Sequence, residues 1–193
     1  MNFKKQLELL LANGQNEKGF SSAIEESITD EVYYNLKVFD FDSTLTDGNH
    51  YDPNPSQVFY DNFVPHLTSQ FSSDLCVIVT ARSSADGVYK FLNKKLGNDY
   101  PACKVYAVGG GLSHMPTHDA VELVHAKRKG AALAQLLDAI PSSKIDVEIF
   151  DDIPENLERM KDACDIKNIN CNLVLVDNGF ENQKLNEYYY PKG

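Results

Sequence analysis

The sequence predicts an α/β protein built on a five-stranded, mainly parallel sheet with helices on both faces. Five short apolar runs recur along the chain, segments with helical periodicity separate them, and 193 residues suit one compact domain. Near-continuous runs of Val, Ile and Leu are typical of strands buried on both faces. Because strands that alternate with helices are joined by right-handed crossovers, we expect a parallel sheet between two helical layers.

The apolar runs predict strands over 35–41, 75–80, 104–109, 146–150 and 172–176. The periodicity between them predicts helices over 56–71, 84–96, 119–138 and 154–164. Pro154 suits the first turn of its helix, where a missing N–H costs nothing. The segment 109–118 begins with three glycines, so we expect a mobile loop at the rim of any site beside it.

Residues 1–30 are expected to form an N-terminal amphipathic helix and a connecting arm, followed by the main domain over 31–193. Phe3, Leu7, Leu10 and Leu11 share one helical face, which we expect to dock on the chain's own body. No segment approaches the roughly 18 uninterrupted apolar residues of a membrane span. The sequence does not indicate an oligomeric state.

Charge and cysteine usage exclude further classes of protein. The formal net charge of −10 disfavours extended binding to nucleic acid or to an anionic membrane. The four cysteines contain no CxxC pair, which excludes a zinc ribbon. We therefore expect reduced thiols and a cytoplasmic location.

Polar side chains lie at the carboxyl ends of three predicted strands. Asp40 and Asp42 lie at the end of the first, Thr80 ends the second, and Asp151 and Asp152 follow the fourth. In such sheets ligands bind outside the carboxyl ends of the strands, so these groups are expected at one site. Four neighbouring carboxylates repel one another unless a cation lies among them, and a few hard oxygen ligands favour Mg²⁺.

The pattern resembles the haloacid dehalogenase (HAD) superfamily of phosphotransferases over about residues 36–176. Residues 40–46, DFDSTLT, are similar to the first motif of the family, DxDxT followed by an apolar residue. The run 77–80 is similar to the second motif, and 150–156 to the fourth, an acidic pair that opens a helix. The family's fold implies a three-layer Rossmann-like protein, here with a minimal cap because the spacings between motifs leave little room for a larger one.

The resemblance implies a phosphatase in which Asp40 is the nucleophile and Asp42 the general acid and base. Thr80 and a lysine, the third motif, would hold the phosphoryl oxygens. Lys129 is preferred, because Lys129-Gly130-Ala131-Ala132-Leu133 resembles the family's lysine-led helix, and Lys127 is the second choice.

The resemblance also implies where Mg²⁺ and substrate would bind. The metal ligands would be Asp40, the backbone carbonyl of Asp42, and one or both of Asp151 and Asp152. Further substrate contacts are expected from residues next to the motifs, namely Ser43, Thr44, Ala81, Arg82 and Lys127.

The minimal cap resembles family members that act on macromolecules, such as the phosphatase half of polynucleotide kinase-phosphatases, and short members found in bacteriophages. A phosphorylated nucleic-acid end or nucleotide is therefore the expected substrate, and a phage-infected cell a candidate setting. A small-molecule nucleotidase and a catalytically silent HAD-like binding protein remain as alternatives. A receiver domain is disfavoured, because receivers place the acidic pair after the first strand, whereas here it follows the fourth.

Overall fold

The computed structural model describes residues 33–48, 58–69, 73–97, 103–113, 115–140, 145–177 and 180–184. They contain one six-stranded sheet in the order β3-β2-β1-β4-β5-β6. Its strands are β1 (Tyr34–Phe39), β2 (Asp74–Thr80), β3 (Lys104–Ala107), β4 (Ile145–Asp151), β5 (Cys171–Asp177) and β6 (Phe180–Lys184). The first five strands pair in parallel, which confirms the predicted α/β fold, and the unpredicted β6 runs antiparallel to β5.

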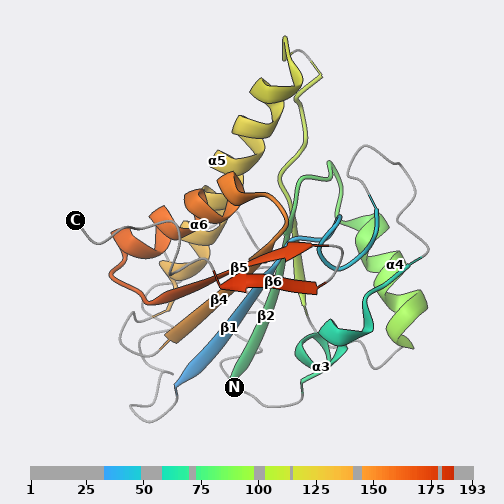
Figure 1. The fold of residues 1–193 in the computed structure, drawn as a ribbon, viewed down its shortest axis with the longest axis vertical. Helices are drawn as coiled ribbons and strands as arrows, with labels where there is room; N and C mark the ends of the chain where they lie inside the picture. Colours follow the sequence, from blue (N-terminus) through green and yellow to red (C-terminus); the bar gives the residue numbers. More distant parts are fainter. Residues whose placement is uncertain are drawn as a thin grey trace, which may run out of the picture.

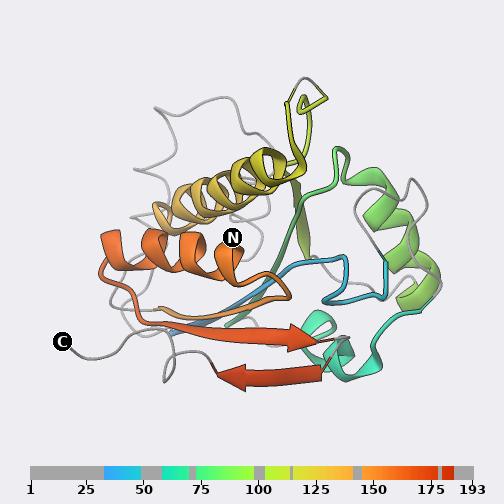
Figure 2. The same cartoon turned by 45° about the horizontal axis from the view of Figure 1, so that its top comes forward.

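Helices cover both faces of the sheet, as predicted. α5 (His118–Leu137) and α6 (Pro154–Ile166) lie on one side, and the short α3 (Val64–Leu67) and α4 (Asp86–Leu96) on the other (Figure 1). Figure 2 shows α5 and α6 side by side above the sheet. Thr117 caps α5, since its side-chain oxygen accepts a hydrogen bond from the Ala120 N–H.

Of the expected helix over 56–71, the structure describes residues 58–69, and the helical part there is shorter than predicted. A 3-10 turn, η1 (Asp61–Phe63), leads directly into the four-residue α3. The chain before it is extended, because Phe59 bridges Thr46 and the Tyr60 N–H donates to the Leu45 carbonyl. Around residues 59 and 60, backbone pairing with the loop after β1 therefore replaces the helix that the periodicity predicted.

The hydrophobic core has two halves, one on each face of the sheet, and β1 shows how the sequence divides between them. Leu36 and Val38 point into the half that α5 and α6 cover. Phe39 points into the other half, where it stacks on Phe150 with ring centroids 4.7 Å apart. This alternation fixes which strand-end side chains face α5.

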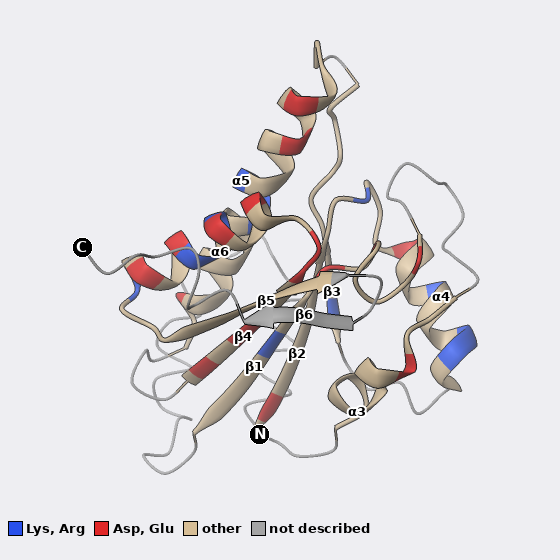
Figure 3. Cartoon of the chain, viewed as in Figure 1, with Lys and Arg blue, Asp and Glu red and all other residues tan. Residues whose placement is uncertain are grey.

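The loop after β3 is held on two sides. Gly109 fits only without a side chain, because a Cβ there would lie 1.7 Å from the Ala81 carbonyl oxygen. Arg128 Nη1 donates to the carbonyls of Val108 and Gly110 at 2.8 and 2.6 Å. Figure 3 shows acidic bands on the first turns of α5 and basic ones further along the helix. Whether the loop is mobile stays a prediction.

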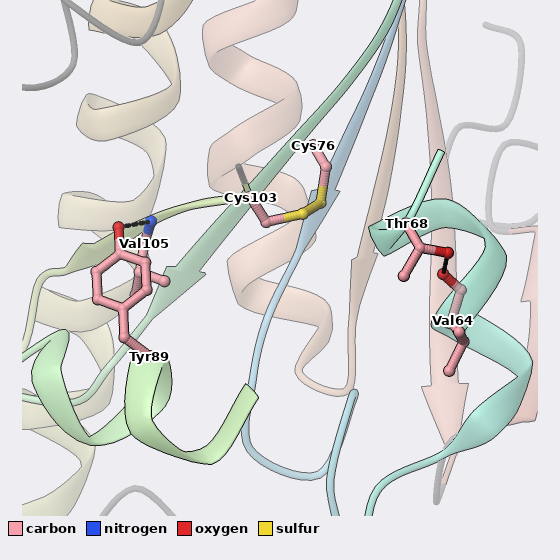
Figure 4. The surroundings of a disulfide bond; sticks show 6 residues. All are labelled: Val64, Thr68, Cys76, Tyr89, Cys103 and Val105. Atoms are coloured by element: carbon pink, nitrogen blue, oxygen red, sulfur yellow. Dashed lines mark hydrogen bonds between the residues drawn. A yellow bond between two sulfur atoms is a disulfide. The ribbon is translucent and has the colours of Figure 1, made fainter. Parts of the chain in front are cut away.

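The cysteines form two disulfides, Cys76–Cys103 and Cys164–Cys171, so the expectation of reduced thiols is wrong. Their Cα atoms are 4.8 and 6.2 Å apart, within the range that a disulfide spans. Figure 4 shows the first of them beside Tyr89, whose hydroxyl accepts from the Val105 N–H at 3.0 Å. The fold brings together cysteines whose spacing carried no pairing signal.

The predicted N-terminal helix and arm lie outside the described residues, as do His114 and the chain beyond residue 184. Among the helices of the described ranges, none has the length and apolar character needed to cross a membrane.

Candidate active site

The alternation along β1 and β4 places two aspartates side by side, facing α5. β1 and β4 pair with Phe39 opposite Phe150, and the Asp40 N–H donates to the Phe150 carbonyl at 2.8 Å. Asp40 continues the face of Val38, and Asp151 continues the face of Ile149, which packs in the same half of the core. Both carboxyl groups are therefore buried at the carboxyl edge of the sheet, under α5.

Lys129 of α5 joins these two carboxylates. Its Nζ donates to Asp40 Oδ1 at 2.8 Å and to Asp151 Oδ2 at 2.7 Å, and its side chain is 1% exposed. Gly130 allows the close approach of the helices, because a Cβ there would lie 2.6 Å from the Arg159 carbonyl oxygen of α6. Lys127 is exposed and faces away, so the structure brings Lys129 rather than Lys127 to the carboxylates.

The cluster holds more negative than positive charge. Burial raises the pKa of Asp40 well above its ordinary value, Lys129 opposes that rise, and the neighbouring aspartates add to it. Burial and the charge of Asp151 raise the pKa of Asp152 to about 7. For Lys129, burial lowers the pKa, but the charges of Asp151 and Asp40 outweigh it and the net pKa lies above the ordinary value. A further cation would relieve this repulsion.

The residues present fit a divalent cation. Within the described ranges, Asp40, Asp151 and Asp152 form a group whose ligand oxygens lie within 4.8 Å of one another and could hold a metal ion. Asn156 donates from Nδ2 to Asp151 Oδ1 at 2.8 Å, while its buried Oδ1 has no hydrogen-bond partner among the described residues. Carboxylate and amide oxygens are the hard donors that Mg²⁺ prefers.

Asp42 is held by Arg82. Arg82 Nε donates to Asp42 Oδ2 at 3.0 Å and Nη2 donates to Oδ1 at 2.5 Å, in the two-pronged geometry that guanidinium groups favour. The guanidinium also lies over the Phe41 ring, 5.5 Å from its centroid. Arg82 is therefore a partner of Asp42 in this conformation.

A cavity of about 230 Å³ opens at this edge, and six of the predicted site residues line it: Asp40, Asp42, Ser43, Ala81, Lys129 and Asp152. Ser43 turns the chain with a positive φ of 60°, an uncommon conformation for a residue with a side chain. The cavity wall does not include the other predicted residues, Thr44, Thr80, Arg82, Lys127 and Asp151.

Thr80 lies outside this wall for a reason found in β2. Val77 and Val79 point toward α5 and α6, whereas Ile78 packs in the other half of the core. Thr80 therefore shares the face of Ile78, fully buried, and its hydroxyl accepts from the Arg82 N–H at 3.2 Å. Thr44 is fully buried too, and its Oγ1 has no hydrogen-bond partner within the described segments.

Four residues that the sequence did not assign to the site also line the cavity: His118, Glu122, Ile153 and Asn156. The sequence signal that could have found His118 and Glu122 is their helical spacing from Lys129. Glu122 and His118 precede Lys129 by seven and eleven residues, so all three share one helical face. Asn156 lies in the first turn of α6, after the acidic pair.

No family model and no curated protein matches the chain. Among solved structures, the HAD domain of the effector protein Lem4 from Legionella pneumophila matches 82% of this chain and 93% of that one. The two are 14% identical, with a TM-score of 0.46.

Proposed function

We propose that this chain is a Mg²⁺-dependent phosphomonoester hydrolase of the HAD type. The observation that carries the proposal is the contact of Lys129 with Asp40 and Asp151 at the carboxyl edge of the sheet, where the DxDxT-like segment begins. The buried Lys129 ammonium offers positive charge to a phosphoryl group beside the Asp40 carboxylate, which is the anionic nucleophile of the proposal. Such positioning and charge stabilisation supply most of the catalysis in phosphoryl transfer.

In the proposed reaction Asp40 attacks phosphorus with a carboxylate oxygen, and the bond from phosphorus to the leaving oxygen breaks. The leaving oxygen takes a proton from the Asp42 carboxyl group, which releases an alcohol and leaves a phosphoaspartate. A water molecule then attacks that phosphorus and gives its proton to the Asp42 carboxylate. The acyl phosphate bond breaks, and inorganic phosphate and the Asp40 carboxylate are regenerated.

Asp40, Asp151 and Asp152 would hold Mg²⁺, with Asn156 Oδ1 and the Asp42 carbonyl as further oxygens nearby. The ion would neutralise charge on the carboxylates and on the phosphoryl oxygens. The Lys129 ammonium would contact these same carboxylate and phosphoryl oxygens. The buried, unpartnered oxygen of Asn156 supports this ligand set.

Before substrate binds, Asp42 is hydrogen-bonded to Arg82. Because Arg82 donates to both oxygens of Asp42, we expect one of those hydrogen bonds to open when Asp42 turns toward the leaving oxygen. Substrate binding supplies a reason, since a phosphoryl oxygen is an alternative acceptor for the guanidinium. Arg82 would then move from Asp42 to the substrate.

The substrate would be a nucleotide or a phosphorylated nucleic-acid end. The net charge of −10 argues against a long nucleic-acid groove but allows contact with one terminal phosphate. A small-molecule nucleotidase and a silent HAD-like binding protein are the competing functions. A cytoplasmic location stays a prediction. The expectation of reduced cysteines no longer supports it, because disulfides persist chiefly in oxidising compartments.

Phosphate release from p-nitrophenyl phosphate, with Mg²⁺ and with chelator, tests the proposal. The wild type and the exposed control Asp165→Asn should both release phosphate with Mg²⁺, whereas Asp40→Asn should not. Retained activity in Asp40→Asn would remove Asp40 as the nucleophile. A folded wild type that binds Mg²⁺ yet hydrolyses neither this ester nor any nucleotide would favour the silent binding protein.

A further inference from the structure

One face of α5 carries polar side chains from the proposed catalytic centre to its opening. His118, Glu122, His125 and Lys129 follow one another at steps of four, three and four residues, which keeps them on one side of the helix. Lys129 reaches the aspartates, and both Glu122 and His118 line the same cavity. The first turns of α5, which begins at His118, extend past the carboxyl ends of the strands (Figure 1).

Glu122 lies between two histidines. Its Oε1 is 3.6 Å from His118 Nε2, and its Oε2 is 3.9 Å from His125 Nδ1. The His118 side chain is 65% exposed and that of Glu122 is 23% exposed, whereas His125 is buried. The opening of the cavity therefore presents an imidazole and a carboxylate side by side, both within reach of a ligand.

This pair fits hydroxyl groups better than a second phosphate. A carboxylate only accepts hydrogen bonds, so Glu122 can bind a hydroxyl but repels another anion beside the already acidic centre. An imidazole N–H donates, so His118 can bind the oxygen of the same or an adjacent hydroxyl. A cavity of about 230 Å³ is smaller than most ligand pockets, so it accommodates the phosphoryl group and the first atoms of the leaving group. The following atoms of a substrate would then be close to His118 and Glu122, which line the same cavity.

We propose that His118 and Glu122 bind sugar hydroxyls of the leaving group and select sugar phosphates or nucleotides as substrates. The inference rests on the proposed phosphohydrolase function. Glu122 accepts from a hydroxyl, and His118 donates to a hydroxyl oxygen. Neither residue takes part in the bond changes at phosphorus, so their contribution depends on the leaving group.

The test compares kcat/KM for three phosphomonoesters: phenyl phosphate, which has no hydroxyl, ribose 5-phosphate and adenosine 5′-monophosphate. Loss of one hydrogen bond to substrate corresponds to about a tenfold change, so His118→Ala and Glu122→Gln should each lose about tenfold on a hydroxylated ester. On phenyl phosphate, which has no hydroxyl, both should lose clearly less than on the hydroxylated esters. Asp119→Asn, the same kind of charge loss on the neighbouring exposed residue, should match wild type on all three.

A loss confined to adenosine 5′-monophosphate would identify a nucleotide as the source of the hydroxyls, and a loss on both sugar esters would identify the sugar itself. Equal losses on phenyl phosphate and the sugar esters would overturn the selective role, as would unchanged kinetics on all three. A wild type that releases phosphate from none of the esters would instead defeat the proposed function. The two failures are thus distinguishable by the wild-type rate on phenyl phosphate.

Discussion

Replacement of Lys129 by methionine, Lys129→Met, removes the cation of the site while keeping a long side chain. Two hydrogen bonds, at 2.8 and 2.7 Å, disappear, and Asp40 and Asp151 remain buried without their shared cation. Removal of one partner of a buried ion pair typically costs about 3–5 kcal/mol, so the free energy of unfolding should fall by about that much in chelator. The exposed Lys127→Met on the same helix should change it by less than about 0.5 kcal/mol.

Urea denaturation of both variants and the wild type, in chelator and in saturating Mg²⁺, measures these differences. If the divalent ion binds the same carboxylates, it should restore part of the stability lost in Lys129→Met, since it supplies the missing positive charge. Phosphatase activity should stay at least about 100-fold below wild type even so, because a positioned donor to the transition state is gone. Equal, small effects of the two substitutions would refute the assignment of Lys129 as the cation that the acidic cluster requires.

Three further predictions follow from the same structure. In the metal-free protein, Asp152 keeps its proton up to about pH 7 when folded but loses it near 3.8 when unfolded. The free energy of unfolding, measured by urea denaturation in each buffer, should therefore decrease by up to about 4 kcal/mol between pH 4 and pH 7. Asp152→Asn should remove this decrease, and Mg²⁺ should oppose it. Gly130→Ala should lower the free energy of unfolding by about 1–3 kcal/mol and should lower kcat, because the new Cβ would press on the Arg159 carbonyl. Ala131→Val, at the exposed neighbouring position, should leave stability in thermal melts and phosphatase activity nearly unchanged. Reduction of the two disulfides, which close segments with sequence separations of 27 and 7 residues, should lower the free energy of unfolding by about 3.5 and about 2.4 kcal/mol. Activity at 25 °C should survive reduction, since Cys103 and Cys171 lie at the amino ends of β3 and β5, away from the site; equal loss of both properties would contradict that separation.

The parallel strands and the position of Asp40 and Asp151 could be predicted because apolar runs and strand-end polarity are local signals. Thr80 shows the limit of that reasoning. Its position at a strand end was visible in the sequence, but the side of the sheet that it faces depends on the phase of β2 against α5. The helix expected around residue 60 failed for a similar reason, because pairing with Thr46 is a contact between distant segments.

The disulfides and the sixth strand likewise depend on tertiary contacts. Cys76 and Cys103 are neighbours only because β2 and β3 pair, and nothing in their spacing indicates it. The strand Phe180–Lys184 contains four polar residues in a row, so it lacks the apolar run by which the other strands were recognised. His118 and Glu122 were within reach of prediction, since their helical spacing from Lys129 is a sequence property.

Arg128, the neighbour of Lys129 in the chain, binds the loop after β3. One residue of α5 holds the carbonyls of Val108 and Gly110, and the next holds the carboxylates of the site. A force that displaces the loop after β3 therefore acts on the same helical turn that positions the buried ammonium. A large ligand that contacts that loop would therefore touch a segment bound directly by the neighbour of Lys129 in the chain.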